Sequence, residues 1–96
     1  MTIAEVIELV REITGVRVDY LGRKGNLAQT NARYLAIVLM DEFGYANTAI
    51  AAALNIERTT TYNAINEAGH LLENDPEFKK IYKASGERMA DMEEKK

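Results

Sequence analysis

The sequence contains no cysteine and no tryptophan, and it has a single proline, Pro76, and a single histidine, His70. Without cysteine the chain forms no disulfide and offers no thiolate ligand to a metal ion. One histidine is too few for the usual zinc sites or for a nucleophile–histidine–acid arrangement. A glycine-rich phosphate loop of the Walker type is also missing. These absences predict a protein that is not an enzyme and carries no cofactor.

Long apolar runs are absent as well. None approaches the roughly 20 residues of a membrane-spanning helix. The first ten residues mix Glu5 and Glu8 into an amphipathic pattern, which differs from the apolar centre of a signal peptide. We therefore expect a cytoplasmic protein without a membrane partner. A length of 96 residues, 47% of them hydrophobic, is typical of one globular domain with a modest core.

The charges are separated along the chain. Its net charge is −3, whereas nucleic-acid-binding domains usually have a basic surplus. Residues 16–34 nevertheless carry a net charge of +3, residues 67–78 carry −4 and residues 79–86 carry +3. The cations of the first of these segments are Arg17, Arg23, Lys24 and Arg33. This separation predicts one basic face and one acidic face.

Apolar residues recur three or four positions apart, and no strand-like alternation is visible, which predicts an all-α fold. We expect a compact bundle of about five helices that contains a helix-turn-helix. The expected helices are Ile3–Thr14, Asn31–Phe43, Thr48–Leu54, a fourth from Arg58 to Leu72 or Glu73, and a fifth that begins at Pro76. A short helical turn is expected from Val18 to Leu21 and a loop from Gly22 to Ala28.

Capping residues define the expected helix ends. The pattern from Thr2 to Glu5 predicts a capping box, and Gly15 and Gly44 predict helix ends. The other expected N-caps are Thr30, Asn47 and Asp75. After Gly86 the chain becomes mostly charged. We therefore expect one DNA-binding domain over residues 1–86, followed by a frayed tail over residues 87–96.

The segment from Asn47 to Leu72 has the pattern of a helix-turn-helix. A short alanine-rich helix is followed by a turn in which Leu54 and Ile56 anchor the chain and Asn55 suits a left-handed backbone. The residues expected to face inward are Thr61, Ala64, Ile65, Ala68, Leu71 and Leu72. Those expected to face outward are Arg58, Thr59, Thr60, Asn63, Asn66 and Glu67.

The outward residues suit the reading of base edges in the major groove of double-stranded DNA. Arg58 can pair with guanine or hold a phosphate, and Asn63 can pair with adenine. Glu57 can accept from the amino group of cytosine, and Thr59 and Thr60 can contact phosphates or a thymine methyl group. This pattern predicts sequence-specific DNA binding with no small-molecule substrate. Helical hairpins that bind no DNA share the same outline, and threonines after a turn often serve only as caps.

A family resemblance rests on Glu57-Arg58-Thr59-Thr60-Thr61, and on Arg23-Lys24 and Thr30-Asn31-Ala32-Arg33 ahead of the long helix. In these residues, and in the order of its helices, the chain from Ile3 to about Tyr82 resembles the C-terminal DnaA-box-binding domain of the bacterial replication initiator DnaA. That domain belongs to the Trp-repressor-like group. The family motif at the start of the recognition helix is Asp-His-Thr-Thr-Val.

The resemblance implies a role for each matching residue. Glu57, Arg58, Thr59 and Thr60 would meet bases or phosphates of the major groove. Arg33 and the loop with Arg23 and Lys24 would hold the DNA backbone or reach toward the minor groove. Asn31 takes the place of a family arginine that reaches the minor groove, and Arg58 takes the place of the histidine. These departures argue against the standard DnaA box as the target.

The acidic total, together with Asn31, Asn66 and Glu67, motivates an alternative. In it, the chain is a protein-interaction or dimerisation module that keeps the fold but has lost affinity for DNA. Five available cations would give a monomer only weak, salt-dependent DNA binding. A homodimer, or a tether to a larger protein, would raise the local concentration and make the binding effective.

Overall fold

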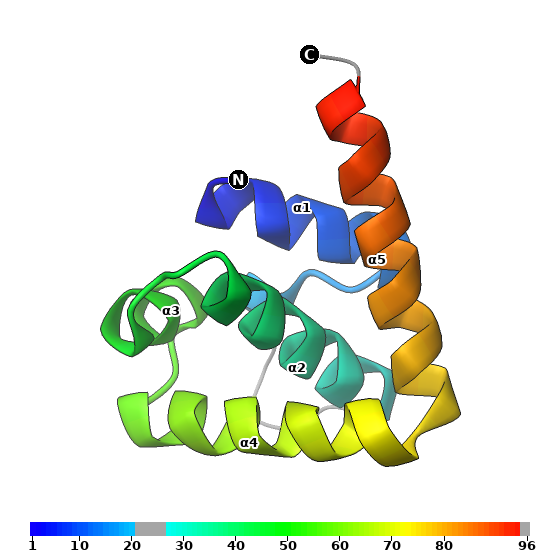
Figure 1. Cartoon of the computed structure of the whole chain (residues 1–96). Coiled ribbons are helices and arrows are strands. Elements are labelled where there is room, and N and C mark those ends of the chain that lie inside the picture. The colour runs from blue at the N-terminus through cyan, green and yellow to red at the C-terminus, as the bar shows by residue number, and fades with distance from the viewer. Residues whose placement is uncertain (21–26, 95–96) are drawn as a thin grey trace.

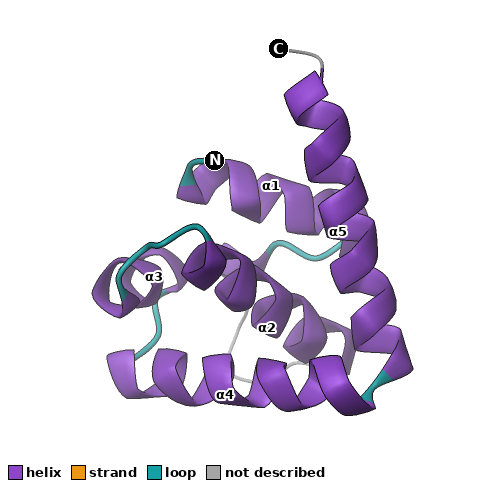
Figure 2. Cartoon of the chain, viewed as in Figure 1, coloured by secondary structure: helices purple, strands orange, loops and turns teal. Residues whose placement is uncertain are grey.

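The computed structural model describes residues 1–20 and 27–94, and these are almost entirely helical (Figures 1 and 2). Within the described ranges there are five α-helices, one short 3₁₀ helix and no strand. The elements are α1 (Ile3–Thr14), η1 (Val18–Tyr20), α2 (Leu27–Glu42), α3 (Asn47–Leu54), α4 (Arg58–Asn74) and α5 (Pro76–Glu94). The predicted all-α bundle of about five helices is confirmed.

Helix α2 lies at the centre of the bundle. It contacts α1, α3, α4 and α5, and Figure 1 shows α1 and α4 on opposite sides of it. The six consecutive residues from Leu35 to Met40 are all buried. A helix that is apolar around its whole circumference has to be covered by other elements on every side. This burial holds the four other helices together.

The predicted ends of α1 are confirmed. The Thr2 side chain accepts from the backbone N–H of Glu5, and the Glu5 side chain accepts from the N–H of Thr2. Gly15 ends the helix in a left-handed conformation with φ 78°, which a residue with a Cβ rarely adopts. The Tyr45 hydroxyl, in the link between α2 and α3, donates to the carbonyl oxygen of Met1. The start of α1 is thereby joined to the segment that leads into α3.

Two of the expected helix starts were wrong. Helix α2 begins at Leu27 rather than Asn31, so Thr30 lies inside the helix and is not its N-cap. Leucine, alanine and glutamine are good helix formers, and they extend the helix back by a turn. Helix α3 begins at Asn47 with Ala46 at the N-cap, and no side chain caps it.

The expected end of α5 was also wrong, because the helix continues through Gly86 to Glu94. A glycine inside a helix costs about 1 kcal/mol relative to alanine, which a few added contacts can offset. Met89 packs against the core, and the Arg88 Nε lies 3.2 Å from a carboxylate oxygen of Glu12 on α1. Residues 87–94 therefore continue α5 rather than form a frayed tail. Lys95 and Lys96 lie outside the described residues.

In the part of the chain that the structure describes, every helix is too short or too polar to span a lipid bilayer.

Removing the cap of α5 should destabilise the fold. The Asp75 Oδ1 accepts from the backbone N–H groups of Glu77 at 3.0 Å and Phe78 at 3.3 Å, as the sequence predicted. Asp75→Ala should lower the free energy of unfolding by about 1 kcal/mol in urea denaturation. Asp75→Asn keeps an acceptor oxygen and should retain most of the stability. An equal loss in both variants would contradict the capping role.

The phenol of Tyr82 on α5 donates a hydrogen bond to a carboxylate oxygen of Glu42 at the end of α2. This bond raises the pKa of Tyr82 to about 12. Since the folded-state pKa lies above the ordinary value of about 10, the bond contributes its full stability below pH 10 and loses it as the pH rises toward 12. Tyr82→Phe should therefore destabilise the protein most at neutral pH, and the difference from wild type should shrink above pH 10. Urea denaturation between pH 7 and pH 12 measures this difference in the free energy of unfolding. Tyr62→Phe is the matched control.

Candidate nucleic-acid interface

Helices α3 and α4 form a helix-turn-helix with a tight connection. Asn55 follows α3 in a left-handed conformation, with φ 54° and ψ 48°, as predicted from the sequence. The backbone N–H of Ile56 donates to the carbonyl oxygen of Ala51 at 3.0 Å. Leu54 is buried, and Ile56 packs against the core. These contacts hold the turn, and they set where α4 begins.

The inward face of α4 is built from small side chains. Thr61, Ala64 and Ala68 are buried, and the Thr61 hydroxyl donates to the carbonyl oxygen of Glu57 at 3.3 Å. Because these side chains are short, α4 lies close against α2, with which it shares its most extensive contacts. Further along, Ile65, Leu71 and Leu72 are partly buried against the core. The inward face predicted from the sequence is confirmed.

The outward face of α4 is polar. The six side chains that were expected to face outward are all exposed, and Glu57, which precedes the helix, is exposed as well. Thr59, Asn63, Asn66 and His70 follow one another at helical spacing along the middle of this face. This central stripe carries hydrogen-bonding groups over three turns and has neither lysine, arginine nor a carboxylate.

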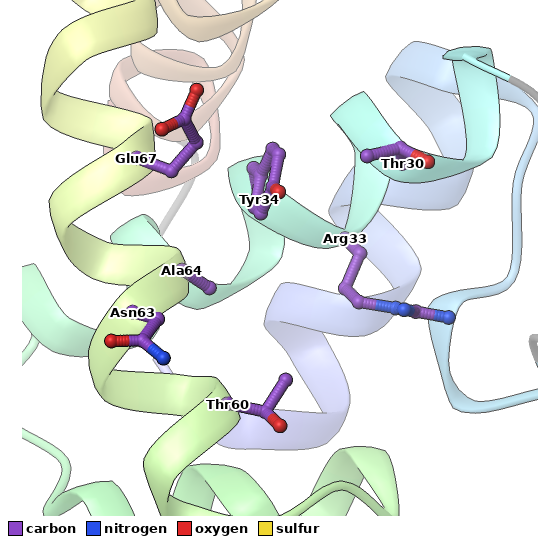
Figure 3. Close-up of a pocket in the computed structure, with 7 residues that line it drawn as sticks. All are labelled: Thr30, Arg33, Tyr34, Thr60, Asn63, Ala64 and Glu67. Carbon is purple, nitrogen blue, oxygen red and sulfur yellow. The ribbon is translucent and has the colours of Figure 1, made fainter.

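A hollow of about 330 Å³ lies on one flank of this stripe, between α2 and α4. Its lining residues are Thr30, Arg33, Tyr34, Thr60, Asn63, Ala64 and Glu67. Figure 3 shows the Tyr34 ring between the two helices, whereas the Arg33 side chain extends away from α4. The structure therefore brings Arg33 to the same groove as Thr60 and Asn63, although α3 and the turn separate them in the sequence.

A second hollow, also about 330 Å³, lies on the opposite flank of α4, next to the start of α3. It is lined by Asn47, Arg58, Thr59 and Tyr62. Tyr62 is 60% exposed, so its aromatic ring is open to a ligand on this flank. Among the described residues, each flank of α4 thus has one arginine, Arg33 on the side of α2 and Arg58 on the side of α3.

The two arginines are available to a ligand. No ion pair or hydrogen bond among the described residues involves Arg33 or Arg58. The Glu57 side chain does not cap α4, so the first backbone N–H groups of the helix have no side-chain partner there. Such groups carry a partial positive charge that favours an anion. Local positive charge at this end of α4 therefore offsets the overall acidity of the chain.

One described site residue, Asn31, does not join this face. Asn31 lines a different hollow, of about 260 Å³, together with Ile13 of α1 and Glu77 of α5. It lies on a side of α2 that faces α1 and α5 rather than α4, so the interface described above does not contain it. Arg23 and Lys24 lie outside the described residues.

Sequence reasoning missed Asn47 as a lining residue, because it was expected to serve as a helix cap. From the sequence, Tyr34 and Tyr62 are the two of the five tyrosines expected near DNA, and they line the hollows on opposite flanks of α4. For Tyr34 the helical pattern alone could not tell which neighbouring helix it would face, since the residues that follow it on α2, Leu35 to Met40, are all buried.

Among the described residues, histidine, aspartate and glutamate side chains form no group of three or more that is placed to hold a metal ion.

Comparisons with models of protein families, with curated proteins and with solved structures found no match. The resemblance to the DnaA domain therefore stays a prediction from the sequence motifs. The case for a function depends on the geometry and charge of the α4 face.

The left-handed conformation of Asn55 should make this position sensitive to substitution. Asn55→Gly should leave the free energy of unfolding nearly unchanged, because glycine adopts this conformation without strain. Asn55→Val should lower it by about 1–2 kcal/mol, since a β-branched residue is strained there. Chemical denaturation of the two variants tests the difference. Equal stability of both would show that the turn relaxes to another conformation.

Proposed function

We propose that this chain binds double-stranded DNA sequence-specifically by inserting α4 into the major groove. The observation that carries the proposal is the outer face of α4, a stripe of hydrogen-bonding side chains with one unpaired arginine among the described residues on each flank. Support also comes from the helix-turn-helix and from the resemblance to the DnaA domain. That resemblance favours a role in replication initiation or in transcription regulation.

The dimensions of the two partners agree. An α-helix with its side chains is about 10–12 Å across, and the major groove is about 12 Å wide. With the stripe facing the floor of the groove, Thr59, Asn63 and Asn66 would contact base edges. Asparagine can donate to and accept from adenine in a paired manner, and threonine can contact the methyl group of thymine. The stripe would therefore make the base contacts that select the DNA sequence.

The two arginines would hold the DNA backbone. The walls of the major groove are the phosphate backbones of the two different strands. Arg33 and Arg58 lie on opposite flanks of α4, so each would meet a different strand. The extended Arg33 side chain in Figure 3 points away from the helix, which suits a phosphate better than a base. Phosphate contacts position the helix, and base contacts select the sequence.

The charges of the chain predict weak binding by a single copy. The overall charge is −3, and only Arg33 and Arg58 flank α4 among the described residues. Few phosphate contacts give a modest affinity, and its dependence on salt is shallow because the slope grows with the number of contacts. A homodimer or attachment to a larger protein would strengthen it. The proposal includes no catalytic activity, no cofactor and a location in the cytoplasm.

The exposed side chain of Tyr62 favours a second candidate, a protein-interaction or dimerisation module. Tyrosine and arginine are enriched at the centres of protein interfaces, and here Tyr62 lies beside Arg58. In this case the α4 face would be covered by a partner protein or by a second copy. A chain that is dimeric at micromolar concentration through Tyr62 and binds no duplex would favour this function.

Removing either flanking arginine should weaken DNA binding. With fluorescence anisotropy on a labelled duplex at low salt, Arg33→Ala and Arg58→Ala should each weaken binding severalfold. Each should also reduce the slope of log affinity against log salt by about one, as expected for the loss of one phosphate contact.

Arg11→Ala is the matched control for both variants. Arg11 lies on α1, on the opposite side of α2 from α4, and pairs there with Glu8 (Figure 1). Arg11→Ala makes the same change in net charge away from the proposed interface. The slope of log affinity against log salt should therefore stay near that of wild type. The proposal fails if the wild-type chain binds no duplex, or if all three variants weaken binding equally.

A further inference from the structure

The hollow between α2 and α4 contains a single carboxylate, that of Glu67. This residue lies two turns after Thr60 and one turn after Asn63 on the same flank of α4. Its side chain is exposed, and Figure 3 shows it pointing away from Arg33. No ion pair or hydrogen bond among the described residues involves Glu67. The negative charge therefore has no counter-ion within the described part of the protein.

An unpaired carboxylate at a DNA-facing surface has a definite chemical consequence. Phosphates repel it, so it weakens binding to any duplex. It accepts hydrogen bonds only, and in the major groove the donors are the exocyclic amino groups of cytosine and adenine. The repulsion between Glu67 and the phosphates is therefore offset only where such an amino group lies within reach of the Glu67 carboxylate. Asn63 lies one turn away and can contact the neighbouring base.

We infer that Glu67 is a specificity-determining residue for DNA, selecting cytosine or adenine, whose amino group can donate to it, over guanine or thymine on the strand that it faces. The inference rests on the proposed insertion of α4 into the major groove. A repulsive element of this kind raises the ratio of specific to non-specific affinity at the expense of absolute affinity. It also accounts for an acidic side chain on a face where more positive charge would bind DNA more tightly.

The first experiment compares Glu67→Gln with Glu87→Gln on a duplex of arbitrary sequence. Both changes remove one negative charge, but Glu87 is exposed on α5 next to Arg88, which pairs with Glu12 of α1, and Figure 1 shows α1 on the opposite side of α2 from α4. At low salt, Glu67→Gln should tighten binding by about threefold to tenfold, whereas Glu87→Gln should change it by less than about twofold. Fluorescence anisotropy measures both.

The second experiment uses a duplex enriched by the wild-type chain from a pool of random sequences. The preference of Glu67→Gln for this duplex over the arbitrary one should be about tenfold lower than that of wild type, because one base contact is lost. A second selection with Glu67→Gln should lose the preference at one base pair and keep the rest of the sequence. Glu87→Gln should keep the wild-type preference.

The outcomes separate this inference from the proposed function. If wild type binds DNA but Glu67→Gln behaves like Glu87→Gln in both experiments, the inference is overturned and the proposed function stands. Weaker binding of Glu67→Gln to the arbitrary duplex, or failure of wild type to enrich any sequence, would also overturn it. If neither wild type nor either variant binds a duplex, the proposed function fails first.

Discussion

The burial of α2 is the constraint on which the rest of the structure depends. Six consecutive residues from Leu35 to Met40 are buried, so this helix has no solvent face over more than one and a half turns. Helices α1 and α4 cover opposite sides of it, and α3 and α5 complete the cover. Removing large apolar side chains from water supplies most of the driving force for such an arrangement. The polar residues of the other helices are left to the surface.

The same packing creates the candidate interface. Ala64 and Ala68 let α4 lie close to α2, and this closeness brings Arg33 of α2 to the edge of the α4 face. The turn at Asn55 then directs the first residues of α4, including Arg58, toward α3. A polar, hydrogen-bonding stripe between two arginines is the result. The proposed function and the proposed role of Glu67 both depend on this placement rather than on the net charge of the chain.

Charge placement bears on how an acidic chain could carry the proposed DNA-binding surface. The acidic residues that would oppose DNA binding include Glu67 on the flank of the candidate interface, for which we propose a role in selectivity. Others, such as Glu8 and Glu12, lie on α1 and pair with Arg11 and Arg88. Since screened charges act over about 10 Å at ordinary salt, the charges near α4 matter most for a ligand bound there.

Local sequence determined the features that depend on a few neighbouring residues. The capping box at Thr2, the left-handed Asn55 and the cap at Asp75 were all predictable, because each involves backbone groups within three or four positions. The inward and outward faces of α4 followed from helical periodicity.

Only the tertiary structure decided which distant groups meet. Arg33 joins Thr60 and Asn63, whereas Asn31, two residues earlier on α2, faces α1 and α5 instead. The continuation of α5 past Gly86 likewise depends on Met89 packing against the core and on Arg88 meeting Glu12. A helix buried on every side shows no preferred face in its sequence, so its neighbours are set by packing of the whole bundle.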